Sequence, residues 1–403
     1  MGTALKSVEV VAAGHICLDV IPSLCTQLGM GTLLVPGKLV EIGAAQIAVG
    51  GAAANTGLAL HRLGLRTKLM GKIGSDLFGE AILRILREYD HELADGMIIA
   101  PGEHTSYTIV INPPQIDRIF LHCTGANDHF AADDLQVEEL AGARLFHFGY
   151  PPLMRQMYMN GGTELAALLS RVKGRGLTVS LDMAKPDPGS PAGQADWRSI
   201  LMKALPFVDV FLPSFEEILF MLRRGRYEEL AAAHGSDLLP FAEGPLLREL
   251  AEELLTLGSA IVVLKLGEHG LYLRTTSDPS RLADMGKGAV GMIEAWLDRE
   301  LLAPCFEVEV TGTTGAGDCT IAGFLAGLLR GYGPEETLNG AVAAGACNVE
   351  QADATSGVRS WEAIEARLAA GWPKRPVHHA LQEWSKARDS SGIWHGPAER
   401  RKR

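Results

Sequence analysis

Short apolar segments alternate with helix-like segments along most of this chain, and this alternation constrains the fold more than any other feature of the sequence. The apolar segments are rich in β-branched residues and end at Gly or polar residues, as buried strands do. The alternation predicts an α/β fold in which helices flank a large, mostly parallel sheet. The strands are expected over residues 8–13, 68–73, 145–148, 177–181, 208–212 and 260–264, and the helices over 52–63, 77–89 and 162–172.

A second, smaller sheet is expected in the first third of the chain. Residues 107–111 and 118–122 read as paired strands around a Pro-Pro turn, and residues 33–47 read as a β-excursion. These segments predict a small β-sheet lid drawn from parts of 20–50 and 104–126.

Two later regions break the alternation. Residues 275–303 are expected to form an insertion between two strands, with a helix over 294–302. The tail over 373–403 is polar and poorly periodic, so we expect a C-terminal extension that packs loosely or forms an interface. One large α/β domain is therefore predicted over 1–372.

The composition narrows the classes of function. The chain has 403 residues, of which 47% are hydrophobic, so it can bury a large core. Its net charge of −11 leaves no basic stripe for nucleic acid. Six scattered cysteines without a CxxC pair argue against a zinc site or a disulfide framework. Without a signal peptide or an apolar run long enough for a membrane span, we expect a cytoplasmic protein with no membrane partner.

A Gly/Thr-rich loop over 310–317 opens an apolar helix that continues to Leu329. A helix N-terminus offers free amides and a positive dipole end, and Gly315 and Gly317 allow a phosphate to approach the backbone closely. Asp318 would repel a bound phosphate, but it suits a base that takes the proton of an attacking hydroxyl. The alternative is a helix-stabilising charge after a tight turn. The Walker A pattern and a complete GxGxxG are absent, which argues against a Rossmann oxidoreductase.

A second candidate site begins at Gly50 and Gly51, which open a helix of small residues. Asn55 is a poor choice for a helix interior, but its amide both donates and accepts hydrogen bonds, which suits a polyol. The alternative is an Asn that bonds a neighbouring turn, with small residues that permit close helix–sheet packing.

These segments together resemble the PfkB (ribokinase-like) carbohydrate kinase family over residues 8–370. Residues 313–324 are similar to the signature DTTGAGDxFxxGF, residues 50–64 to GGxxxN followed by a helix ending in LG, and residues 71–79 to GxxGxDxxG. The resemblance implies a ribokinase-like fold with a small β-sheet lid on a kinase domain over 1–372. It also implies homodimers.

The resemblance assigns roles residue by residue. Asp318 would be the catalytic base, and the amides of Gly315, Ala316 and Gly317 the anion hole. Glu217 would act near magnesium through water. Substrate hydroxyls would be bound by Asp19, Gly51 and Asn55, and Arg118 on the second lid strand could reach over a sugar. The residues expected near the nucleotide are Lys185, Ser214, Lys265, Gly267, Gly270, Thr313 and Asn348.

Several of these residues also fit an ordinary structural role. Lys185 and Arg118 also read as solvated side chains, Glu217 as an exposed acidic helix start, and 267–270 as a plain turn. Several positions depart from the family pattern, among them Ser214 and Gly312. Ser214 replaces an Asn, and Gly312 replaces an Asp that helps to organise a monovalent-cation site, which leaves that cation doubtful.

The predicted function is that of an ATP- and Mg²⁺-dependent kinase that transfers the γ-phosphoryl group to a hydroxyl of a sugar or sugar derivative. The alternatives are a nucleoside kinase of the same family and a catalytically silent nucleotide- or sugar-binding protein.

Overall fold

The core of the molecule is a ten-stranded sheet with the strand order β15-β16-β14-β13-β12-β11-β10-β9-β1-β4. The computed structural model describes residues 8–24, 35–112, 119–235, 237–377, 383–387 and 391–397. The six strands from β4 to β12 run parallel, and those from β13 onward pair antiparallel. The strands are β1 Val10–Gly14, β4 Thr67–Met70, β9 Leu145–Gly149, β10 Thr178–Leu181, β11 Val210–Phe211, β12 Ile261–Lys265, β13 Leu271–Thr275, β14 Glu300–Ala303, β15 Ser385–Lys386 and β16 Trp394–His395.

Helices cover both faces of this sheet, because its strands bury side chains on both sides. In β12, Val262 and Leu264 enter one hydrophobic core, whereas Ile261 and Val263 enter the other. Helices α5, α6, α7 and α9 contribute to the first core, and α2, α12, α13 and α14 to the second. The helices are α2 Ala52–Arg62, α3 Leu77–Tyr89, α4 Arg155–Tyr158, α5 Thr163–Lys173, α6 Trp197–Ala204, α7 Phe215–Leu222, α8 Arg224–His234, α9 Gly244–Thr256, α10 Pro279–Ala283, α11 Ile293–Trp296, α12 Ala316–Leu329, α13 Pro334–Val349 and α14 Trp361–Ala369.

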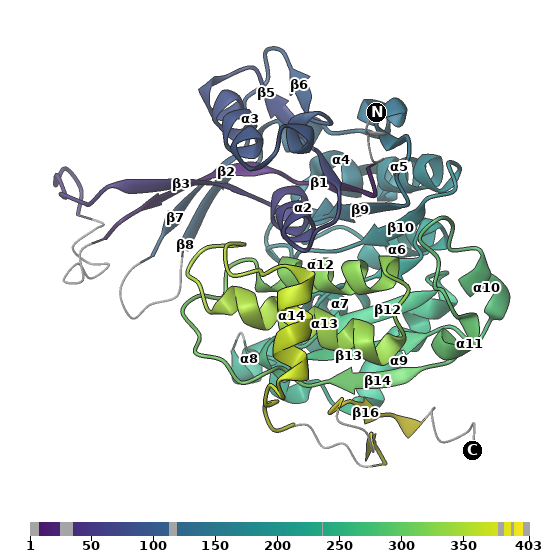
Figure 1. Ribbon diagram of the computed structural model, residues 1–403. Helices are drawn as coiled ribbons and strands as arrows, with labels where there is room; N and C mark the ends of the chain where they lie inside the picture. The colour runs from purple at the N-terminus through teal and green to yellow at the C-terminus, as the bar shows by residue number, and fades with distance from the viewer. Residues whose placement is uncertain are drawn as a thin grey trace, which may run out of the picture.

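A separate four-stranded sheet in the order β3-β2-β7-β8 extends to one side of this body (Figure 1). Its strands are β2 Cys17–Pro22, β3 Ala45–Gly50, β7 Tyr107–Ile111 and β8 Ile119–Cys123. A short two-stranded sheet, β5 Lys72–Gly74 with β6 Ile98–Ala100, lies near α3. The predicted fold class, a large mostly parallel sheet with helices and a small additional sheet, is confirmed.

The helix expected over 294–302 is wrong. Only α11 is helical there, and residues 300–303 form β14, which pairs antiparallel with β13. Asp298 takes a left-handed backbone with φ 54°, which ends the helical path. Glu300 is then buried, where its carboxylate accepts hydrogen bonds from Arg248 and Tyr272. These long-range partners, which local spacing does not reveal, favour the strand.

Strands β15 and β16 extend the large sheet beyond β14, at the bottom of Figure 1. Strand β16 pairs with β14, and β15 pairs with β16. Within the described ranges, no helix is both long and apolar enough to cross a membrane.

Candidate active site

Asp318 lies in the first turn of α12, at the start of the helix that follows the Gly/Thr loop. Its side chain is 2% exposed. Asn55 on α2 donates from Nδ2 to Oδ2 of Asp318 over 2.9 Å. The Tyr150 hydroxyl lies 2.9 and 3.0 Å from the two carboxylate oxygens. Two predicted residues, Asn55 and Asp318, therefore meet from opposite ends of the chain, and both candidate motifs form one site.

The environment of Asp318 holds its pKa above the usual range. Burial raises the pKa, whereas Lys265 and the hydrogen bonds from Asn55 and Tyr150 oppose the rise. A carboxylate with a raised pKa accepts a proton from a hydroxyl more readily than an ordinary aspartate does.

Tyr150 was not predicted from the sequence. It follows β9 directly and has a left-handed backbone with φ 62°, which is rare for a bulky residue and occurs most often at functional positions. Burial raises the pKa of Tyr150 well above its ordinary value, and the charges of Asp318 and Asp182 add to this rise. The hydroxyl therefore stays protonated and can donate a hydrogen bond. Its place at the carboxyl end of a parallel strand, where ligands gather, was the one available sequence signal.

Lys265 is surrounded by carboxylates at the end of β12. Its Nζ lies 2.6 Å from Oδ1 of Asp182, whose side chain is fully buried. Burial lowers the pKa of Lys265, but Asp182, Glu217 and Asp318 outweigh it and hold the pKa above the ordinary value. Burial raises the pKa of Asp182 and of Glu217, and Lys265 opposes both shifts. Three carboxylates thus share one cation.

Glu217 has a local structural role as well. Ser214 caps the N-terminus of α7, and its backbone amide donates to Oε2 of Glu217 over 2.7 Å. The Ser214 hydroxyl accepts from the Glu217 amide over 3.3 Å, which completes a capping box. Ser214 therefore serves as a helix cap at the position where the family pattern has Asn.

The loop before α12 depends on glycine at two positions. Gly315 has φ 69°, and a Cβ there would come 2.2 Å from the carbonyl oxygen of Ala354. A Cβ at Gly312 would come 2.9 Å from Cα of Ala352. The chain therefore leaves little room for an aspartate at 312. Gly317, by contrast, has no crowding, because a Cβ there would lie 3.7 Å from Cδ of Lys265.

A cavity of about 350 Å³ leads away from the start of α12. Its polar end contains four predicted site residues, Lys265, Thr313, Ala316 and Gly317. Gly267 and Gly270, in the turn between β12 and β13, also line the cavity. The far walls are apolar and come from Leu271, Phe306, Val308, Val342, Ala346 and Val349. A polar end and largely apolar walls are typical of a site for a small ligand with an anionic group.

Three predicted nucleotide residues, Lys185, Ser214 and Asn348, lie outside this cavity lining. Lys185 is half-exposed, and its Nζ lies 3.2 Å from Oε2 of Glu216. Asn348 is buried on α13, where its Nδ2 donates to the Thr314 carbonyl over 2.8 Å. Asn348 thus supports the Gly/Thr loop from behind. Arg118 lies outside the described residues.

The predicted substrate residues Asp19 and Gly51 lie where β2 and β3 meet α2. A Cβ at Gly50 would come 2.1 Å from Oδ2 of Asp19, and one at Gly51 would come 2.6 Å from Nδ1 of His15. The Gly pair therefore admits two polar side chains. Burial lowers the pKa of His15 to about 3, so its imidazole is neutral.

A mostly parallel sheet is covered by helices, and a cavity ends at a helix N-terminus beside a buried carboxylate. This arrangement is typical of the active site of a phosphotransferase. The model of the pfkB family carbohydrate kinases matches residues 9–361, and the chain belongs to this family. The protein is thus a carbohydrate kinase, as its sequence predicted.

Individual relatives are distant. An uncharacterized sugar kinase of Archaeoglobus fulgidus is 29% identical over 69% of this chain and 89% of that protein. A probable chloroplastic fructokinase-6 of Arabidopsis thaliana is 25% identical over 91% of this chain and 84% of that protein. The structure of Arabidopsis thaliana ribokinase complexed with ribose and ATP has a TM-score of 0.67 at 18% identity, and the match covers 90% of this chain and 99% of that one. This structure shares the fold.

Proposed function

We propose that this carbohydrate kinase transfers the γ-phosphoryl group of ATP to a hydroxyl of an unphosphorylated sugar, with Asp318 as the general base. The observation that carries the proposal is the buried Asp318 carboxylate at the N-terminus of α12, bonded to Asn55 and Tyr150. Residues 52–54 are fully buried alanines. They offer no cation for a phosphate already present on the sugar.

The proposed reaction begins with a sugar hydroxyl near Asp19, Gly51 and Asn55. Asp318 accepts the hydroxyl proton while the oxygen attacks the γ-phosphorus, and ADP leaves. The amides of 315–317, at the positive end of α12, stabilise the negative charge on the phosphoryl oxygens. Lys265 supplies a positive charge beside the same amides.

The nucleotide fits the cavity between the β12–β13 turn and helices α12 and α13. The apolar walls suit a flat base, and the polar end at Lys265 and Gly317 suits phosphates.

A magnesium ion fits the carboxylate end of the site. Oδ2 of Asp182 is buried and has no hydrogen-bond partner in the described part of the chain, and Glu217 lies within electrostatic reach. Both are oxygen donors, which magnesium prefers together with phosphate and water. Glu217 would hold the ion through water. Bound there, it would neutralise charge on the ATP phosphates.

Replacement of Gly317 by Ala tests the anion hole. An added methyl group meets only ordinary contacts inside the protein, but it occupies the space through which a phosphate oxygen reaches the amides. We expect the KM for ATP to rise by roughly tenfold, equivalent to about 1.4 kcal/mol, while the melting temperature is unchanged or higher. Gly225→Ala on α8, where a Cβ meets nothing within 4 Å, is the control. An unchanged KM in Gly317→Ala would contradict the role.

Replacement of Tyr150 by Phe tests how the base is held. Loss of the hydroxyl removes a donor that favours the ionised form of Asp318, so the pKa of Asp318 should rise. The acidic limb of the kcat/KM profile should then move to higher pH by about one unit, as expected for a hydrogen bond to a charged group. Tyr158→Phe, on α4, should leave the profile in place. A limb that does not move in Tyr150→Phe would rule out this positioning role.

The proposed activity is tested by ADP release with Mg²⁺-ATP across sugars, sugar acids, sugar phosphates and nucleosides. Fructose and ribose come first, because fructokinases and a ribokinase are among the relatives. A signal with sugars alone would support the proposal, and a signal with nucleosides alone would favour a nucleoside kinase. ATP binding without ADP release on any compound would favour a silent binding protein.

The homodimer and the cytoplasmic location stay predictions. A single monomer mass in light scattering would refute the dimer.

A further inference from the structure

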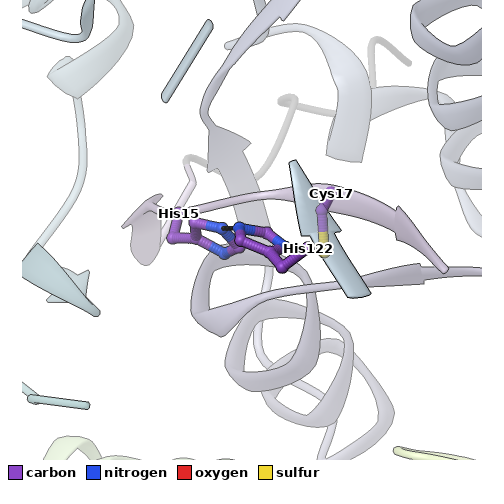
Figure 2. Close-up of side chains that lie close together, drawn as sticks. All are labelled: His15, Cys17 and His122. Atoms are coloured by element: carbon purple, nitrogen blue, oxygen red, sulfur yellow. Dashed lines mark hydrogen bonds between the residues drawn. The ribbon is translucent and has the colours of Figure 1, made fainter. Parts of the chain in front are cut away.

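Two histidines and a cysteine meet beside the substrate end of the site, although the sequence argued against a zinc site. His15 lies between β1 and β2, Cys17 begins β2, and His122 lies on β8. One ligand atom from each residue lies within 4.8 Å of the other two. Figure 2 shows the two tilted imidazole rings close together and joined by a dashed line, with the Cys17 sulfur beside His122.

The spacing of the two imidazoles suits a metal ion. Their Nε2 atoms lie 3.2 Å apart. Two nitrogen ligands about 2.0–2.1 Å from a tetrahedral zinc ion are separated by roughly 3.3–3.4 Å. The Cys17 sulfur lies within 4.8 Å of a ligand atom of each histidine, so it must move inward to reach the same ion. We propose that His15, Cys17 and His122 bind one Zn²⁺.

The surroundings support these three ligands. Oγ1 of Thr108 on β7 lies 3.0 Å from Nδ1 of His122 and 3.6 Å from Sγ of Cys17. Such an outer hydrogen-bond partner orients metal ligands and tunes their affinity. Oδ1 of Asp19 lies 3.4 Å from the same sulfur. The Asp19 carboxylate is therefore close enough to supply the fourth ligand of the ion. Binding displaces the thiol proton of Cys17 to solvent.

The ligand chemistry selects the metal. Imidazole and thiolate are the ligands of zinc, whereas magnesium prefers carboxylate, phosphate and water oxygens. The two ions should therefore occupy separate sites, with magnesium near Asp182 and zinc near Cys17.

A bound zinc ion would link the small sheet to the body, because His122 comes from β8 and His15 from the turn after β1. On the proposed function, which this consequence assumes, Zn²⁺ should slow phosphoryl transfer by fixing the small sheet over the sugar site. The site itself is tested by direct metal binding, which does not depend on that activity.

The experiment uses the full-length, reduced protein in excess Mg²⁺, titrated with Zn²⁺ by calorimetry and with Co²⁺ by absorption. We expect one ion per chain and a thiolate-to-cobalt charge-transfer band. Cys17→Ser should abolish the band. His122→Asn should keep the band but weaken affinity by more than the roughly 10–100-fold cost of losing an outer partner. Cys123→Ser, next in β8, should change neither, and circular dichroism checks that each variant folds. No band in the wild type, or a band that survives Cys17→Ser, would overturn the proposal and leave a hydrogen-bonded histidine pair.

Discussion

Asp318→Asn is expected to bind ATP normally and to turn over roughly 10²–10⁴ times more slowly than the wild type, the usual cost of a lost general base. Asn has nearly the same shape and can still accept a hydrogen bond from Tyr150, but it cannot take a proton from the sugar hydroxyl. Turnover and nucleotide affinity are measured separately, by ADP release and by calorimetry.

A matched control distinguishes this role from that of a helix-stabilising charge. Asp196 caps the N-terminus of α6 and accepts a hydrogen bond from the Ser199 amide over 3.1 Å. Asp196→Asn should change stability by less than about 1 kcal/mol and leave turnover intact. If Asp318→Asn turned over at a rate near that of the wild type, Asp318 would be no more than such a charge.

Lys265→Met is expected to lower the free energy of unfolding by about 3–5 kcal/mol, as when one partner of a buried ion pair is removed. Asp182, Glu217 and Asp318 would lose their shared cation. Burial already holds their folded-state pKa values above the unfolded ones, and loss of the lysine raises them further. The loss of stability relative to the wild type should therefore grow as the pH rises above the wild-type folded-state pKa values, of which that of Asp182 is about 8. Urea unfolding at several pH values measures it.

Lys185→Met provides the control for the loss of a lysine. The pair of Lys185 with Glu216 is partly exposed, so its removal should cost less than about 1 kcal/mol and show little dependence on pH. Asp182→Asn in the Lys265→Met background should restore part of the stability. A Lys265→Met variant as stable as Lys185→Met would show that the three carboxylates do not need the lysine.

Local pattern predicted the elements of the body well. The helix expected over 77–89 is α3, with the same ends, and Asp76 caps it through the amide of Gly79. The strand expected over 68–73 is wrong as one element. It divides at Gly71 into β4 and β5, which belong to different sheets. A Cβ at Gly71 would meet Cγ2 of Ile16 at 2.6 Å, a contact that only the tertiary structure reveals.

The same limit applies to the site. Family motifs identified Asp318 and Asn55, and the structure joins them by one hydrogen bond. No motif marked Tyr150 or the grouping of His15, Cys17 and His122, because each depends on residues that are far apart in the chain. Such contacts can be identified only in the folded structure, where the strands bring these residues together.

The distance along the chain between Asp318 and its partners has a consequence for synthesis. Asn55 and Tyr150 precede Asp318 by 263 and 168 residues. At roughly 5–20 residues per second, Asn55 leaves the ribosome about 10–50 s before Asp318 is made. A nascent chain can therefore form early strands and helices, but it lacks the residue that we propose as the general base until position 318 has been made. On that proposal, a chain released before residue 318 has been translated cannot transfer a phosphoryl group.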